Sequence, residues 1–139
     1  MLNSTDPTKK IVCRNLWKVF GDAPQKGMML AQQGASRADI LSQTKQVEAV
    51  SDVSFEVAAG QIFVVMGLSG SGKSTRVRCR TRLIEPTQGE IWVNGADVLQ
   101  MNEATLRDLR RHTISMVFQR FGLFPHRRVV ENVAYGLEV

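Results

Sequence analysis

The chain has 139 residues, of which 43% are hydrophobic and 22% are charged, and its formal net charge is +5. This length and composition fit one globular domain with an apolar core and exclude a low-complexity chain. The basic residues are dispersed, so we expect no nucleic-acid partner, and no apolar run approaches the length of a membrane span.

The cysteines and the N-terminal residues bear on the compartment. Cys13 and Cys79 form neither a disulfide framework nor a metal-binding motif, so we expect two buried, inert thiols in a reducing compartment. Residues 1–10 are polar and do not resemble a signal peptide. These features favour a chain that is soluble or peripheral to a membrane.

A strand followed by a helical insertion is predicted at the start of the chain. Residues 11–20 partly alternate between apolar and polar side chains, which favours a strand. Residues 22–46 differ in character and indicate a helical insertion between two strands. Within it, Ser36 and Asp39 have the spacing of a capping box, which predicts a short helix over 37–43.

Two further strands lead into a glycine-rich segment. Residues 47–57 resume strand character, and 61–66 form a short apolar run that also predicts a strand. The glycine-rich segment 67–75 follows, and then a helix is predicted to about Ile84. This order of strand, glycine loop and helix is the context that a phosphate-binding loop requires.

The later elements follow a mixed pattern of strands and helices. We predict a strand over 90–93, a tight turn at Asn94-Gly95, a helix that Asn102 caps and that ends near Arg111, a strand over 113–118, and a helix over 129–137.

Residues 67–75 match the complete phosphate-binding motif G-x-x-x-x-G-K-[ST]. Its glycines permit backbone angles that turn successive amide groups toward phosphates, and the following helix adds its positive dipole end. We expect Lys73 to reach the outer phosphates and the Ser74 hydroxyl to ligate Mg²⁺. The alternative is a strand-to-helix turn without a ligand. The candidate nucleotide-contacting residues are Gly67, Leu68, Ser69, Gly70, Ser71, Gly72, Lys73, Ser74 and Thr75.

The chain resembles the N-terminal half of an ABC-type nucleotide-binding subunit. The matching features are Ser69 and the Ser-Thr ending of the loop, Asp52-Val-Ser-Phe55, Gly60-Gln-Ile62, Met116-Val-Phe-Gln119 and Glu131-Asn-Val133. The resemblance implies that residues 1–139 are a partial nucleotide-binding domain of the α/β class. It would have a P-loop NTPase (RecA-like) core with an antiparallel β subdomain, truncated before the helical signature subdomain.

A closer subfamily is also indicated. The chain is similar to the ATPases of bacterial quaternary-amine importers, the glycine betaine/proline type, in its 22–46 insertion, Met66-Gly-Leu-Ser69, Arg82-Leu-Ile-Glu-Pro-Thr87 and Phe124-Pro-His126. The cofactors that this implies are ATP and Mg²⁺. The implied partners are a second ABC ATPase subunit, membrane permease subunits and, indirectly, a periplasmic or extracellular solute-binding protein. The implied location is the cytoplasmic face of the bacterial membrane.

The resemblance also implies roles for residues outside the loop. Phe20 would stack on adenine, unless it is a core aromatic at a strand end. Gln119, in the Q-loop region 116–126, would contact Mg²⁺ and the attacking water, unless it is a polar residue that ends a strand. Residues 120–128, with Phe124, would face the coupling helix of the permease, and the alternative is an ordinary loop.

The chain departs from the family pattern in two respects. It holds no Leu-Ser-Gly-Gly-Gln signature, Walker B aspartate or catalytic glutamate, and neither His112 nor His126 lies where a switch histidine would. We therefore expect the chain alone to hydrolyse no ATP. Arg76 and Arg80 occupy helix positions where the family has leucines, so these side chains must reach solvent or be buried without a partner.

Several alternatives stay open at this point. The chain could be a partial reading frame or a degenerate gene copy, and a non-catalytic nucleotide-binding remnant is one rival function. A non-transport ABC ATPase is a second rival, which the 22–46 insertion disfavours. A P-loop kinase or GTPase is a third, which the position of Gln119 and the absence of an Asn-Lys-x-Asp motif disfavour.

Overall fold

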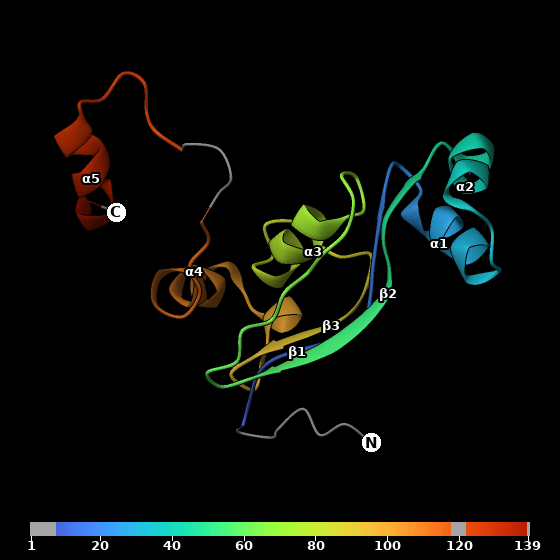
Figure 1. Cartoon of the computed structure of the whole chain (residues 1–139), viewed down its shortest axis with the longest axis horizontal. Coiled ribbons are helices and arrows are strands. Elements are labelled where there is room, and N and C mark those ends of the chain that lie inside the picture. Colours follow the sequence, from blue (N-terminus) through green and yellow to red (C-terminus); the bar gives the residue numbers. More distant parts are fainter. Residues whose placement is uncertain (1–7, 118–121, 139) are drawn as a thin grey trace.

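A four-stranded antiparallel sheet organises this computed structural model, which describes residues 8–117 and 122–138 (Figure 1). The strand order is β2-β1-β3-β4. The two long strands pair along their whole length, and a tight turn at Asn94-Gly95 joins the last two, as predicted. The strands are β1 (Lys9–Phe20), β2 (Val47–Ala58), β3 (Gln88–Val93) and β4 (Ala96–Asp97).

A bulge bends the pairing of β1 with β2 near its middle. Asn15 and Asp52 both have positive φ angles, 44° and 43°. The amide of the Asn15 side chain donates to the Asp52 carboxylate at 2.9 Å, and the Asn15 backbone N–H donates to the Ser54 hydroxyl at 2.8 Å. These bonds give partners to the Asn15 backbone and side chain at the point where the register of the two strands shifts.

Helices lie over one face of the sheet and at its ends (Figure 1). The predicted caps are confirmed: Ser36 and Asp39 form the capping box of α2, and the Asn102 side chain accepts from the Thr105 N–H at the start of α4. The insertion 22–46 holds two helices rather than one. The helices are α1 (Pro24–Gln32), α2 (Arg37–Thr44), α3 (Lys73–Arg80), the 3₁₀ helix η1 (Val98–Gln100), α4 (Glu103–His112) and α5 (Val129–Glu138).

The main core lies between the sheet and the helices that cover it. Leu16 and Ile91 from the sheet are fully buried against Cys79 of α3 and Leu106 of α4. Because α4 places its apolar side chains on one face, the helix packs there while Arg107 and Arg111 reach solvent. A second cluster around Trp17, Val19 and Met28 anchors α1 on the end of β1.

Both cysteines are buried free thiols, as the sequence predicted. Burial raises the pKa of Cys13 to about 11, and the nearby guanidinium of Arg80 partly opposes that rise. Burial likewise raises the pKa of Cys79 to about 11. At neutral pH both groups are protonated and behave as small apolar core residues.

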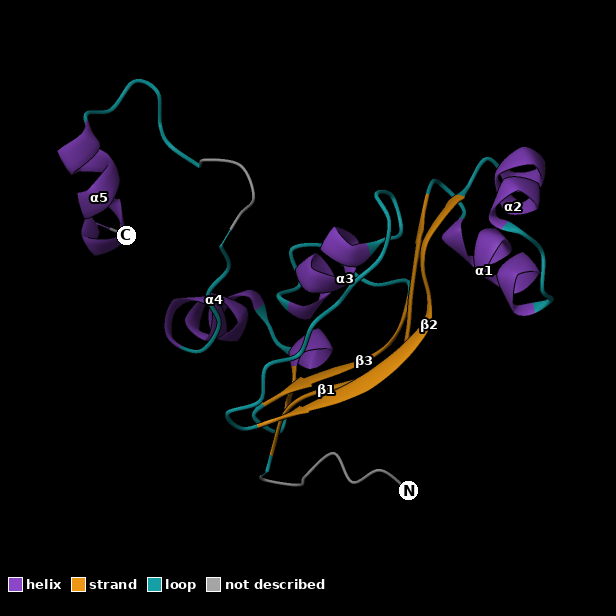
Figure 2. Ribbon diagram, viewed as in Figure 1, coloured by secondary structure: helices purple, strands orange, loops and turns teal. Residues whose placement is uncertain are grey.

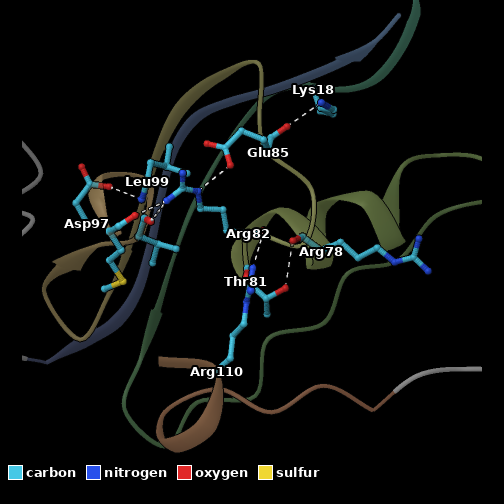
Figure 3. Close-up of polar contacts among 10 residues, drawn as sticks. Lys18, Arg78, Thr81, Arg82, Glu85, Asp97, Leu99 and Arg110 are labelled. Atoms are coloured by element: carbon cyan, nitrogen blue, oxygen red, sulfur yellow. Dashed lines mark hydrogen bonds and ion pairs between the residues drawn. The ribbon is translucent and has the colours of Figure 1, made fainter. Parts of the chain in front are cut away.

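Two arginine side chains bind backbone carbonyl oxygens around the C-terminal end of α3, as Figure 3 shows. Arg110 of α4 donates to the carbonyl oxygens of Thr81 and Arg82 at 3.0 and 2.8 Å. Arg82, at a φ of 50°, donates to the Met101 carbonyl at 2.7 Å and pairs with Glu85 at 2.7 Å. Arg110 thus satisfies carbonyls at the negative end of α3 and ties it to α4, whereas Arg82 binds a carbonyl just after η1 and ties the chain that leaves α3 to that turn.

Two strand predictions and one helix boundary were wrong. Figure 2 shows the segment that leads from β2 to α3 as a loop, and residues 61–66 form no strand. Residues 113–117 form none either, and 118 lies outside the described residues. A strand needs a hydrogen-bonded neighbour, and neither run has one among the described residues. Helix α3 ends at Arg80 rather than near Ile84, because the chain turns into the contacts at Arg82.

Candidate nucleotide-binding site

The phosphate loop lies at the mouth of a cavity of about 510 Å³. The cavity runs from the paired ends of β1 and β2 to the first turn of α3. Its lining residues are Phe20, Val47, Glu48, Ala49, Ser69, Gly70, Gly72, Lys73, Ser74 and Thr75. The structure thus brings Phe20 together with the loop, although some fifty residues of sequence separate them.

Gly72 fixes the start of α3 beside β2. It caps the helix with a φ of 84°, a left-handed conformation that strongly favours glycine. A Cβ on Gly72 would also overlap the backbone carbonyl oxygen of Ala49. Only a residue without a side chain permits both the turn and this close approach, so the sequence requirement for glycine here has two causes.

Lys73 lies over the loop that precedes it. Its ammonium group donates to the carbonyl oxygens of Gly67 and Leu68, each at 2.5 Å, and lies 3.4 Å from the Ser71 hydroxyl. The Ser71 backbone N–H donates to the Leu68 carbonyl at 3.2 Å, which closes the loop. The ammonium group is therefore already held at the cavity by neutral carbonyl oxygens. A phosphate oxygen could replace them as the hydrogen-bond acceptor.

The first turn of α3 supplies the polar end of the cavity. Ser74 and Thr75 both line it, and Ser74 is exposed. The backbone N–H groups of this turn have no intrahelical acceptors, and the helix dipole adds partial positive charge at the same place. Together with Lys73, these groups make this end suited to a polyanion.

Phe20 provides the apolar end. It pairs with Val47 across the strands, and both residues line the cavity. The Phe20 ring is 38% exposed, and the ammonium of Lys18 lies 4.8 Å from its centroid. An exposed aromatic at a strand end beside a polyanion site can stack on a planar base, and the core alternative for this residue fits its exposure less well.

Three lining residues were missed by the sequence reasoning. Val47, Glu48 and Ala49 begin β2, and no local motif marks them. Their place in the cavity follows from the pairing of β2 with β1, which sets Val47 opposite Phe20 and Glu48 opposite Val19. Only a prediction of strand register could have found them.

Gln119, Arg120 and Phe121 lie outside the described residues, so their predicted roles are not placed by the structure. The rest of the predicted permease-facing segment is described and leads into α5. The Asn132 side chain accepts from the Phe124 N–H at 2.8 Å and donates to the carbonyls of Arg127 and Arg128 at 3.1 and 3.0 Å. These bonds fix the loop before α5.

Arg76 and Arg80, two of the three arginines of α3, are both partly buried. Arg80 lies over the Phe55 ring at 5.3 Å, and burial lowers the pKa of its guanidinium. The Nε of Arg76 is buried and has no hydrogen-bond partner among the residues that the structure describes. Both side chains line a cavity of about 240 Å³ next to Phe63 and Val64.

Among the residues that the structure describes, no helix has the length and apolar character needed to cross a membrane.

A family model for ABC transporters matches residues 50–138.

Relatives in bacteria are similar over most of this chain. The glycine betaine/carnitine transport ATP-binding protein GbuA of Listeria monocytogenes is 51% identical over 94% of this chain and 33% of its own length. The glycine betaine/proline betaine transport system ATP-binding protein ProV of Escherichia coli is 47% identical over 94% of this chain and 32% of its own length. The chain thus spans about a third of the length of these curated relatives.

A solved structure has the same fold over the region that it shares with this chain. It is the dimeric post-hydrolysis state of the ATP-binding cassette MJ0796, bound to ADP and Pi. The TM-score is 0.70 at 26% sequence identity, and the match covers 92% of this chain and 47% of that chain. The fold is therefore that of an ATP-binding cassette of mixed α/β structure with an antiparallel sheet.

Proposed function

This chain belongs to the ABC transporter family, and we propose that it forms part of the ATP-binding subunit of an importer for glycine betaine or a related quaternary amine. One observation carries the nucleotide role. Lys73, the first turn of α3 and Phe20 line a single cavity with a polyanion end and an aromatic end. The names of the relatives GbuA and ProV support the substrate class.

The loop and its surroundings fit ATP with Mg²⁺. Lys73 and the N–H groups of the first turn of α3 would bind the phosphates, and the Ser74 hydroxyl at that turn would ligate the ion. The bound ion supplies neutralisation of phosphate charge. The carbonyl oxygens of Gly67 and Leu68 hold Lys73 at the cavity before the nucleotide arrives, so little reorganisation is needed. Phe20 would stack on the adenine.

The remaining roles concern the complete protein. We propose that Gln119 contacts Mg²⁺ and the attacking water, and that residues 120–128 face a membrane permease at the cytoplasmic face of the membrane. The complete subunit would have a RecA-like core and would pair with a second ATPase subunit, as the cassette MJ0796 does in its dimeric structure. A solute-binding protein would deliver the amine to the permease.

The transport role is tested by affinity purification of the complete protein from membranes of its source. We expect a membrane permease to co-purify in detergent, and the amount to fall when Phe124 is replaced by Ala. Recovery of the ATPase without any permease, at every detergent and nucleotide condition, would contradict a transport role and favour a non-transport ATPase.

A further inference from the structure

Gln46 is a buried polar residue at the point where the 22–46 insertion rejoins the sheet, and it is only 6% exposed. It directly precedes Val47, which pairs with Phe20 and lines the nucleotide cavity. A buried side-chain amide lowers stability unless its donor and its acceptor both find partners. The partners of this amide therefore show what the residue holds in place.

The Gln46 amide joins the two ends of the insertion. Its Oε1 accepts from the Ala23 N–H at 3.2 Å, where α1 begins, and its Nε2 donates to the Thr44 carbonyl at 2.9 Å, where α2 ends. Because one partner is a donor and the other an acceptor, they fix the orientation of the amide. Glutamate lacks the donor, and methionine lacks both groups. One glutamine side chain thus ties the chain that leaves β1 to the chain that enters β2.

Gly21 packs directly against this amide. A Cβ on Gly21, which has a φ of 131°, would overlap Oε1 of Gln46, so a glycine is needed there. Gly21 follows Phe20 and Gln46 precedes Val47, so the amide lies just beyond the last pair of the β1–β2 ladder. The position of the Phe20–Val47 pair is therefore linked to the two ends of the insertion, which Figure 1 shows at the ends of β1 and β2.

We propose that Gln46 positions Phe20 for the adenine base, so that the 22–46 insertion determines the shape of the aromatic end of the site. This inference rests on the proposed nucleotide binding. Phe20 is the last residue of β1 and is 38% exposed, so core packing alone does not hold its ring. A ring that is already held in place loses less freedom when a base stacks on it. Gln46 does not line the cavity, so it acts through Phe20 and is a positioning residue.

The test compares Mg–ATP with Mg–tripolyphosphate, which has no base, by titration calorimetry on the 139-residue chain. Gln46→Met keeps the size of the side chain and removes both hydrogen bonds. It should weaken ATP binding by about threefold to tenfold, a part of what base stacking contributes, and leave tripolyphosphate binding unchanged. Added to Phe20→Ala, it should weaken ATP binding no further, because both changes act on one contact. The control is Gln43→Met, at an exposed position of α2, which should keep both wild-type affinities.

A second measurement needs no variant. The Ala23 amide donates to Gln46, so its hydrogen exchange reports on how often this bond opens. Saturating Mg–ATP should slow that exchange in the wild-type chain more than saturating Mg–tripolyphosphate does, because only the nucleotide has a base that favours the bonded arrangement.

The outcomes separate this inference from the proposed function. Equal weakening of ATP and tripolyphosphate binding by Gln46→Met would overturn the positioning role, and so would a folded variant that binds both ligands as the wild type does. Identical Ala23 exchange in the two wild-type complexes would overturn it even if the variant does not fold. Failure of the wild-type chain to bind ATP at all would overturn the proposed function and this inference together.

Discussion

The ammonium group of Lys73 lies 2.5 Å from the carbonyl oxygen of Gly67, so the main cation of the site is held by its own loop. This contact keeps the side chain folded over the segment 67–72 rather than extended into solvent. A phosphate is a stronger acceptor than a carbonyl, and the exchange of one for the other needs only a small movement of the side chain.

Replacement of Lys73 by Ala should weaken Mg–ATP binding by roughly tenfold to a hundredfold, because it removes a hydrogen bond between charged groups worth about 1.5–3 kcal/mol. Equilibrium titration of the folded variant measures the change. Lys26→Ala removes an equal charge from the exposed side of α1 and should leave the affinity unchanged. Equal losses in both variants would mean that net charge, rather than the position of Lys73, determines binding.

Substitution of Gly72 by Ala should destabilise the chain by about 2 kcal/mol or more, since the strain of a positive φ adds to a collision with the Ala49 carbonyl. The matched control is Gly34→Ala. That residue has a φ of 85° but nothing within 4 Å of the added Cβ, so only the backbone strain of about 1 kcal/mol is expected. Urea denaturation of both variants measures the difference, and a similar loss in each would show that the approach to β2 is not tight.

Removal of the Arg110 side chain should lower the free energy of unfolding by about 1.5–3 kcal/mol, because the carbonyls of Thr81 and Arg82 lose a charged donor. Arg111→Ala, one position along on the exposed side of α4, should change it by less than about 0.5 kcal/mol. Thermal or chemical denaturation followed by circular dichroism makes the comparison. Indistinguishable stabilities of the two variants would rule out a structural role for the contacts at the end of α3.

Replacement of Arg80 by Leu should raise the midpoint of urea denaturation of the chain. Burial lowers the pKa of this guanidinium, so the charged form is held in an unfavourable place, and a leucine of the right size would fill the same space. The contact with Phe55 opposes this gain but is the smaller effect. Arg78→Leu, on the exposed side of α3, is the control and should give no increase. A loss of stability in Arg80→Leu would contradict this account of the packing.

Stability should decrease as the pH rises from about 9 to about 11. Burial raises the pKa of Cys13 and of Cys79 from 9.0 to about 11, so the folded chain keeps protons that the unfolded chain releases in this range. The contribution is fully present below pH 9 and is lost as the pH passes through 11. Denaturation at several pH values measures the slope, and a double Cys→Ala variant should have a flatter one. An unchanged slope in that variant would mean that other groups cause the loss.

The sequence predicted the features of this fold that depend on neighbouring residues. The capping box at Ser36, the cap at Asn102 and the loop that ends at Gly72 all follow from short patterns with a local physical cause. The strands over 61–66 and 113–118 were predicted from apolar, β-branched composition. That composition describes a buried strand only when neighbours pair with it, and the described residues offer none.

Part of the site was also predictable, because its residues are neighbours in the sequence. Residues 67–75 form a contiguous motif that the sequence alone reveals, and Ser69, Gly70 and residues 72–75 of it line the cavity. Glu48 was not predicted, because its position depends on the register between β1 and β2 and on the insertion that supplies Arg37. The left-handed conformation of Arg82 also follows from contacts with η1 that no local pattern encodes.

The most direct test of the central claim is calorimetric titration of the 139-residue chain with Mg–ATP, alongside Lys73→Ala. The account expects saturable binding at one site per chain, strongly weakened in the variant and competed by ADP. A folded wild-type chain that shows no saturable heat with ATP, or that binds it as well without Lys73, would contradict the assignment of this cavity as a nucleotide site.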